Sequence, residues 1–346
     1  MFKRILCVFA AAAILFTLAG CKKKDAETPD SPVPDSEQTV QENPYIQNTL
    51  TGVYDIDKDK ANRRPVAIMV DNDSVAQTYT QSGISKADIV YETETEGGIT
   101  RLMAVYADIT KAPQIGDIRS ARYVYVDLAL GHNAIYVHCG LDKVYCAPHL
   151  KDIDNFEVFT DYYARRITYG KAKGWQTLFT DGETLWKGFN EKGWKTTADN
   201  IKNWQDFATE NEEVTLSGTA ANTVLAAFNG SYKSKFTYDP ANKKYIKTSS
   251  HAENTDRNDS APYLFKNVFI LQTDMSYYPG NYRRKIDLTS GTGYYCTGGS
   301  AVKINWKKGD ATNPFVFTNE DGTPLKVNAG NSWVCIAKKD AQISFE

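Results

Sequence analysis

Three ionisable side chains stand at or near the ends of predicted strands, where their types suit acid–base chemistry or ligand binding. Asp71 follows the apolar run 66–70, Glu92 ends the run 87–92, and His138 lies in the run 134–139. In open α/β sheets, ligands bind at the carboxyl ends of strands. Imidazole titrates near neutrality, so His138 is the first candidate for a general base, with Glu92 and Asp71 as supporting carboxylates. The alternative, which is the commoner case, is a structural histidine held by hydrogen bonds.

Three arginines in the same polar stretches form a candidate anion site. Arg101, Arg119 and Arg122 carry planar guanidinium groups, which bind phosphate or carboxylate in a bidentate manner. Arg119 also precedes a predicted helix, whose first backbone amides favour anions. Glu96 and Asn72 complete the candidate ligand-binding set. The alternative is that neighbouring carboxylates neutralise these arginines and the pairs stabilise the fold.

Several common catalytic and metal-binding motifs are absent from the sequence. There is no HExxH, GxSxG or EF-hand loop, no phosphate-binding glycine loop, and no CxxC. Their absence disfavours metalloprotease, α/β-hydrolase, calcium, nucleotide and zinc-ribbon interpretations. We therefore expect no metal ion and no cofactor. The pair Gly97-Gly98 is typical of a hairpin turn, although it would also let backbone approach a ligand closely.

The first twenty residues have the pattern of a secretory signal. Lys3 and Arg4 precede the apolar segment 5–18, which is too short to span the ~30 Å hydrocarbon core as a helix. The segment ends Leu-Ala-Gly-Cys, which is similar to the bacterial lipoprotein box. We expect residues 1–20 to be removed and the Cys21 thiol to receive a diacylglyceryl group. Acyl chains add ~0.8 kcal/mol per buried CH₂, so a multiply acylated Cys21 would anchor the chain to a bilayer.

Residues 21–49 are predicted to be a tether outside the cytoplasm. The segment is rich in Pro, Asp, Glu, Ser and Thr and has few apolar residues, so it cannot bury enough surface to offset its ordering entropy. Beyond Cys21 the chain has four cysteines: Cys139, Cys146, Cys296 and Cys335. In an oxidising compartment these favour the local disulfides Cys139–Cys146 and Cys296–Cys335. Four free buried thiols are the alternative.

Composition limits the remaining possibilities. The chain has 346 residues, 40 Lys+Arg and 42 Asp+Glu, and a formal net charge of −2. A general nucleic-acid binder is therefore excluded. The length indicates about two domains at ~150 residues each. We expect an α/β or α+β domain with a mixed sheet at 50–210, and a smaller, mostly β domain at 211–346.

The expected elements follow hydrophobic patterning and turn residues. In the first domain we expect strands at 66–70, 87–92, 101–107 and 134–139, and a helix at 120–130 capped by Ser120. The segment 161–204 follows no clear pattern. In the second domain we expect strands at 223–228, 235–238, 244–247, 268–272, 301–306, 314–318 and 333–337.

Several sequence motifs of this chain resemble those of a known family. The order of motifs over residues 60–145 resembles the YerB family of bacterial lipoproteins, also known as DUF3048, and residues 317–334 are similar to its C-terminal domain. The motifs are RPVAIMVDN at 64–72, ADIVYE at 87–92, EGGITR at 96–101, IRSAR at 118–122 and His138. The resemblance implies a two-domain envelope lipoprotein and implies no particular activity. Cys139 departs from the family pattern, in which a small residue is expected.

Two functions are compatible with the sequence. The first is a non-catalytic protein, anchored to the bacterial cell membrane, that binds an anionic or glycan ligand or an envelope protein. The second is a hydrolase of a cell-wall polymer or phosphodiester, with His138 as base, Arg101 and Arg119 stabilising negative charge, and Glu92 or Asp71 in support. Because no complete catalytic constellation is present, we favour the first and leave open whether the protein is an enzyme.

Overall fold

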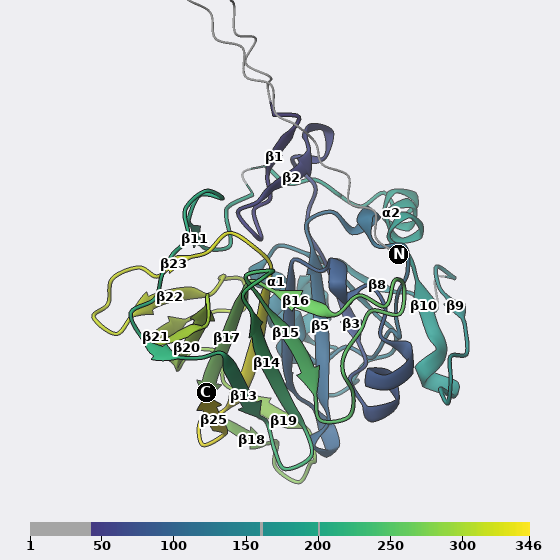
Figure 1. Cartoon of the computed structure of the whole chain (residues 1–346). Helices are drawn as coiled ribbons and strands as arrows, with labels where there is room; N and C mark the ends of the chain where they lie inside the picture. The colour runs from purple at the N-terminus through teal and green to yellow at the C-terminus, as the bar shows by residue number, and fades with distance from the viewer. Residues whose placement is uncertain (1–42, 160–161, 200) are drawn as a thin grey trace, which may run out of the picture. The chain divides into compact units, whose positions relative to one another are not determined.

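The apolar runs of the N-terminal half form adjacent strands in a large mixed sheet (Figure 1). This computed structural model describes residues 43–159, 162–199 and 201–346. Strand β3 (Val66–Val70) is buried along its whole length, pairs in parallel with β7 (Ile135–His138), and pairs antiparallel with β5 (Thr100–Tyr106). A continuous apolar run suits this position because both faces of the sheet are covered.

Within the described residues the central sheet has eleven strands, in the order β12-β21-β20-β17-β24-β4-β5-β3-β7-β8, with β22 paired to β21. β5 is antiparallel to both its neighbours, while β17, β24, β4, β3, β7 and β8 all run in one direction. Its other strands are β4 (Ile89–Glu94), β8 (Asn155–Glu157), β12 (Thr219–Ala220), β17 (Asn267–Thr273), β20 (Ser290–Thr297), β21 (Ser300–Lys307), β22 (Val316–Asn319) and β24 (Ser332–Lys338).

A second, antiparallel sheet of five strands belongs to the C-terminal half. Its order is β16-β15-β14-β13-β25, with bounds Tyr263–Phe265, Lys244–Ser249, Lys233–Asp239, Thr223–Ala227 and Gln342–Phe345. The remaining strands form small ladders: β1 (Tyr45–Gln47) with β2 (Tyr54–Asp57), β6 (Ile115–Gly116) and β9 (Arg165–Arg166) on either side of β10 (Leu178–Thr180), β11 (Asp206–Phe207) with β23 (Lys326–Val327), and β18 (Met275–Tyr277) with β19 (Arg284–Ile286).

Two hydrophobic layers cover the two faces of the central sheet. Alternate side chains of β3 and β5, such as Ile68 and Ala104, lie in the same cluster as Phe236 and Phe265 of the five-stranded sheet. The side chains between them, such as Met69 and Met103, point to the opposite face of the sheet and lie in a cluster with helix α1 (Tyr123–Gly131). This is the period-two alternation of a strand, and it decides which polar side chains of β3, β4 and β5 can meet.

The mixed sheet of the predicted fold class is confirmed, but helices contribute less than an α/β domain would have. In the part of the chain that the structure describes, the α-helices are α1 and α2 (Gly182–Glu191). Shorter helical turns are η1 (Lys58–Lys60), η2 (Ala76–Thr80), η3 (Ile84–Lys86), η4 (Glu96–Gly98), η5 (Ile109–Lys111), η6 (His149–Asp152) and η7 (Gly174–Thr177). The protein is therefore sheet-rich, and α2 occupies part of the segment that the sequence left unassigned.

The predicted helix begins three residues later than expected. Its N-cap is Arg122, whose carbonyl accepts from the amides of Tyr125 and Val126, and no side chain caps it. Ser120 is not the cap, because the amide of Ala121 donates to the carbonyl of Gly140 and the helix has not yet begun at this point. The Ser120 carbonyl instead accepts a hydrogen bond from Arg101.

The Gly97-Gly98 pair forms the predicted turn between β4 and β5. Both glycines have positive φ, 71° and 74°, and the amide of Thr95 donates to the carbonyl of Ile99 across the turn. A side chain at either position would be strained in this left-handed conformation. The predicted strands at 66–70, 87–92, 101–107 and 134–139 correspond to β3, β4, β5 and β7, and those of the C-terminal half to β13, β14, β15, β17, β21, β22 and β24.

The two predicted domains share the central sheet. β24 of the C-terminal half pairs in parallel with β4 of the N-terminal half, Cys335 standing opposite Glu92. Residues 43–346 form one compact unit. The fold also begins before residue 50, because β1 is paired with β2 and the Asn48 side chain donates to the Asp88 carboxylate. Residues 1–42, including the predicted signal and Cys21, lie outside the described residues.

The favoured disulfides are not formed, and the four cysteines described are free thiols. Cys139 packs against the cluster on one face of the sheet and Cys146 lies in the cluster on the other face. Cys296 of β20 and Cys335 of β24 lie on opposite sides of β17. Strands are ~4.8 Å apart, so strands separated by a third are ~10 Å apart, whereas disulfide Cα atoms lie within ~7 Å.

Candidate functional site

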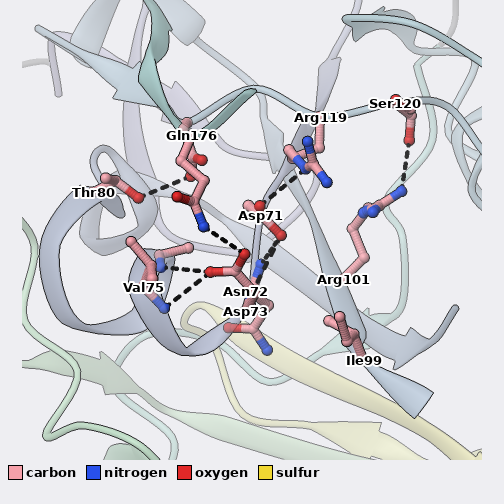
Figure 2. A network of polar contacts seen from close by, with 12 residues as sticks. Asp71, Asn72, Asp73, Val75, Thr80, Ile99, Arg101, Arg119, Ser120 and Gln176 are labelled. Atoms are coloured by element: carbon pink, nitrogen blue, oxygen red, sulfur yellow. Dashed lines mark hydrogen bonds and ion pairs between the residues drawn. The ribbon is translucent and has the colours of Figure 1, made fainter. Parts of the chain in front are cut away.

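Asp71 and Arg119 form the centre of the candidate site. Asp71 follows β3 and lies two residues after Met69, so its side chain is on the same face of the sheet, the face that α1 covers. Its Oδ2 lies 2.9 Å from Arg119 Nε, in an ion pair that Figure 2 shows, although the N–H direction does not make it a hydrogen bond. Oδ1 accepts from the amides of Asn72 and Asp73 at 2.8 and 3.3 Å. Asp71 is buried, while the Arg119 side chain keeps 20% of its exposure.

Arg101 is the least compensated charge of the group. It is the second residue of β5, it is 5% exposed, and Nη1 donates to the Ser120 carbonyl at 3.2 Å (Figure 2). Among the residues that the structure describes, none is a hydrogen-bond partner of its Nε. Burial and the neighbouring charge of Arg122 lower the pKa of Arg101 from 12.5 to about 10, so it stays protonated at neutral pH. A buried, incompletely paired cation is costly unless a ligand completes it.

Arg122 and Glu96 extend the site beside the N-terminus of α1. Arg122 Nε donates to Glu96 Oε1 at 2.6 Å, and Nη1 donates to the Ala121 carbonyl at 2.7 Å. Burial raises the pKa of Glu96, but the hydrogen bond and charge of Arg122 outweigh it and the net pKa is lowered. Both residues line a small hollow of about 20 Å³. Thus Glu96 neutralises Arg122, and Asp71 neutralises Arg119.

Asp117 is a second buried carboxylate that the sequence analysis did not select. Its Oδ1 accepts from Thr80 Oγ1 at 2.9 Å, and its Oδ2 has no hydrogen-bond partner in the described part of the chain. Burial, and then the negative charge of Asp71, raise the pKa of Asp117 well above 3.8. Burial also raises the pKa of Asp71, against the opposing charge of Arg119. In the sequence, only the place of Asp117 in the polar stretch 116–122 indicated that it could belong to the site.

Asp73 and Gln176 close the opposite side of this network. Asp73 Oδ1 accepts from the amides of Val75 and Ala76, and Oδ2 accepts from Gln176 Nε2 at 2.7 Å (Figure 2). These contacts fix the turn after β3 and attach it to the 174–177 segment. Among the described residues, no group of three or more His, Cys, Asp or Glu side chains is arranged to hold a metal ion.

Glu92 and Asn72 face the other side of the sheet and form a saturated polar hub. Glu92 Oε1 accepts from Asn72 Nδ2 at 3.0 Å and from Thr100 Oγ1 at 2.9 Å. Oε2 accepts from Ser234 Oγ at 2.7 Å and from Trp333 Nε1 at 3.1 Å. Four hydrogen bonds on a buried carboxylate leave no lone pair directed at a substrate. The hub joins β4 to the C-terminal half.

His138 is buried and held on both sides of its ring. Nδ1 lies 3.0 Å from the Gly140 carbonyl and 3.3 Å from Glu157 Oε2, and Nε2 lies 3.3 Å from Asn155 Oδ1. Glu157 in turn accepts from the Gly140 amide. Both ring nitrogens therefore face protein oxygens, and these contacts favour the structural alternative for His138.

Comparison with known proteins gives the family. Residues 50–195 match the N-terminal domain, and residues 224–334 the C-terminal domain, of the family described as "Protein of unknown function (DUF3048)". The chain belongs to this family. It is 29% identical over 345 residues to the Bacillus subtilis (strain 168) protein named "Putative lipoprotein YerB", covering 96% of this chain and 95% of that one. It is also similar to the crystal structure of the YerB protein from Bacillus subtilis, with a TM-score of 0.72, 26% identity, and coverage of 86% of this chain and 99% of the other.

The candidate site of this DUF3048 protein lies within the N-terminal family region. The structure brings together Asp71, Arg101, Arg119, Arg122 and Glu96, and it adds Asp117. It places Asn72 and Glu92 on the opposite face and encloses His138. Sequence patterning predicted that these side chains follow neighbouring strands, but it could not assign each side chain to a face of the sheet.

Proposed function

We propose that this DUF3048 protein is an extracytoplasmic lipoprotein that binds an anionic ligand through Arg101, Arg119 and Arg122. The observation that carries the proposal is Arg101: its guanidinium is 5% exposed, its Nε has no partner among the described residues, and the positive charges of Arg122 and Arg119 act on it. A phosphate or carboxylate placed beside it would supply the missing counter-charge and hydrogen bonds.

The anchoring part of the proposal rests on the N-terminal sequence and on the relative. The chain is similar to a protein named as a lipoprotein, and its own sequence has the lipoprotein-like box at Cys21. In the described residues, no helix is long and apolar enough to cross a membrane. In this proposal, acyl chains at Cys21 attach the chain to the bilayer, and the ligand comes from the cell envelope.

Binding fits the geometry better than hydrolysis. The proposed base of the hydrolase, His138, presents neither ring nitrogen to a substrate, and the Glu92 carboxylate is saturated by four donors. The arginines are incompletely neutralised, because Asp71 and Glu96 compensate two of the three. A site with excess positive charge, in which neither His138 nor Glu92 faces a substrate, can hold an anion without transforming it.

Thermal unfolding of the full-length chain in detergent tests the proposal. Inorganic phosphate, glycerol phosphate and muropeptides are added in turn; a ligand at 100 times its Kd stabilises the fold by about 2.7 kcal/mol. We expect Arg119→Gln and Arg101→Gln to abolish the shift. The control Lys307→Gln removes an exposed positive charge elsewhere and should keep it. A shift that persists unchanged in both arginine variants places the anion elsewhere and contradicts the proposal.

A further inference from the structure

The positive charge continues beyond Arg122 onto the β18–β19 hairpin. Glu96 Oε1, which accepts from Arg122 Nε at 2.6 Å, also lies 4.0 Å from Arg283 Nε. Arg283 in turn pairs with the buried carboxylate of Asp142. We name Arg119, Arg101, Arg122 and Arg283 the arginine row. Its members come from three separate parts of the chain, so the row is a product of tertiary structure.

An aromatic hollow lies at the Arg283 end of the row. Its lining combines Arg122, Glu96, Asp142 and Arg283 with the rings of Tyr123, Tyr145 and Tyr278. Tyr145 and Tyr278 stack with ring centroids 3.8 Å apart and an interplanar angle of 15°. The neighbouring ring of Tyr282 is 62% exposed and lies under the Arg283 guanidinium at 4.9 Å.

Aromatic groups also border the Arg119 end. The Arg119 carbonyl accepts from the Cys139 amide at 3.0 Å, and the charges of Arg166 and Arg119 both act on the Cys139 thiol. Arg166 lies over the Phe159 ring at 5.2 Å and donates to the Gly174 carbonyl at 2.7 Å. Phe159 is 53% exposed, and Trp175, next to Gly174, is 64% exposed. Both ends of the row therefore carry exposed rings, and Arg166 adds a further guanidinium at the Arg119 end.

We infer that the arginine row binds a polyanionic, hydroxyl-rich polymer: a glycan or polyol phosphate whose repeating units each carry one negative charge. This inference rests on the proposed function and extends it from one anion to a chain. A single phosphate or carboxylate engages two or three guanidinium groups at most, whereas the row has four and Arg166 extends it. Regularly spaced anions along one polymer would meet them in turn.

Among the carboxylates between the arginines, Glu96 keeps 16% of its side-chain exposure and can accept a hydrogen bond from a ligand hydroxyl group, whereas Asp71 and Asp142 are 2% exposed and only balance the charge of their arginines. Asp71, Glu96 and Asp142 alternate with Arg119, Arg122 and Arg283 along the row. Carboxylate oxygens accept hydrogen bonds from sugar or polyol hydroxyls, and exposed rings stack on the apolar faces of sugars. An internal nucleotide of a DNA strand carries one phosphate, as a glycerol phosphate unit does, but it has no free sugar hydroxyl to donate to Glu96. Glu96 and the exposed rings therefore favour a hydroxyl-bearing polymer.

Calorimetric titration with oligomers of defined length tests the inference. The probes are glycerol phosphate as a monomer and as an octamer, and an eight-nucleotide single-stranded DNA, titrated into the full-length chain in detergent. We expect the octamer to bind at least tenfold more tightly than the monomer. Arg283→Ala and Tyr278→Ala should weaken octamer binding at least tenfold and monomer binding less than twofold. The control Lys285→Ala removes an exposed charge from the same hairpin and should change neither.

Each outcome decides a different point. Equal affinity for monomer and octamer, or an octamer affinity unchanged by both hairpin variants, overturns the polymer inference and leaves the anion site intact. Tighter binding of the DNA than of the octamer overturns the assignment to a hydroxyl-rich polymer. If folded protein binds no anion at all, the proposed function itself fails. Because Arg283→Ala leaves Asp142 without its partner, Arg283→Lys is included and should bind the octamer with intermediate affinity.

Discussion

The carboxylate of Glu92 accepts a hydrogen bond from the indole Nε1 of Trp333 at 3.1 Å, across 241 residues of sequence. The two residues lie on β4 and β24, the parallel pair that joins the halves of the chain. Trp333 is fully buried and Lys247 lies over its ring at 4.7 Å. This polar hub is therefore surrounded by core, and its integrity matters for stability.

Glu92→Ala should destabilise the protein by about 3–5 kcal/mol, because it leaves several buried donors without an acceptor. Urea unfolding followed by tryptophan fluorescence measures the change. The control Glu320→Ala removes an exposed carboxylate and should stay within about 0.5 kcal/mol of wild type. A loss below 1 kcal/mol for Glu92→Ala would show that water replaces the carboxylate and that the hub is not essential.

Asp117→Asn should raise stability increasingly as pH rises. Because the folded pKa is raised above the unfolded value near 3.8, the folded state holds a proton that the unfolded state releases, and wild-type stability falls as pH rises through this interval. The fall is at most about 1.4 kcal/mol per pH unit for one group. Asparagine keeps an acceptor for Thr80 and has no charge to bury. Unfolding at pH 4.5, 6.0 and 7.5 should therefore give a shallower slope for the variant, and parallel slopes would contradict the prediction.

Arg101→Met should stabilise the ligand-free protein by about 1 kcal/mol while removing its response to phosphate. The substitution replaces a buried, incompletely paired cation, on which the charges of Arg122 and Arg119 act, with an apolar side chain of similar length. Urea unfolding in phosphate-free buffer, compared with the exposed-site variant Lys307→Met, measures the effect. A loss of more than 2 kcal/mol would mean that the bond to Ser120 dominates and that the site is structural.

The four cysteines described should react as free thiols in the unfolded chain without any reductant. Alkylation in denaturant followed by peptide mass spectrometry should label Cys139, Cys146, Cys296 and Cys335 completely. In the native protein only Cys139 should react, and slowly, because burial and the nearby Glu157 raise the pKa of its thiol to about 11. Recovery of a linked Cys296–Cys335 peptide would contradict the strand spacing.

Cys21→Ala should prevent lipid attachment. The wild-type chain, expressed in a bacterium with a lipoprotein pathway, should partition into the detergent phase in a phase-separation experiment. The variant should move to the aqueous phase, because the acyl chains supply the partitioning energy. A variant that stays in the detergent phase would show that another feature holds the chain at the membrane.

The sequence by itself determined most of the strands and the family, and it indicated the stretches that supply the candidate site. Continuous apolar runs such as 66–70 predicted buried strands, Gly97-Gly98 predicted the turn between β4 and β5, and the family motifs predicted the DUF3048 assignment. These features depend on local patterning and on backbone conformational preference, which neighbouring residues decide.

Only the tertiary structure decided which side chains meet. Asp71 and Asn72 are adjacent in sequence, yet strand alternation sends one to the arginines and the other to Glu92 on the opposite face. Arg283 and Arg122 are 161 positions apart in sequence, yet both lie beside Glu96. Cys296 and Cys335 are separated by the intervening strand β17. Such pairings depend on sheet order and register, which are set by the packing of the whole chain and which no short stretch of sequence specifies.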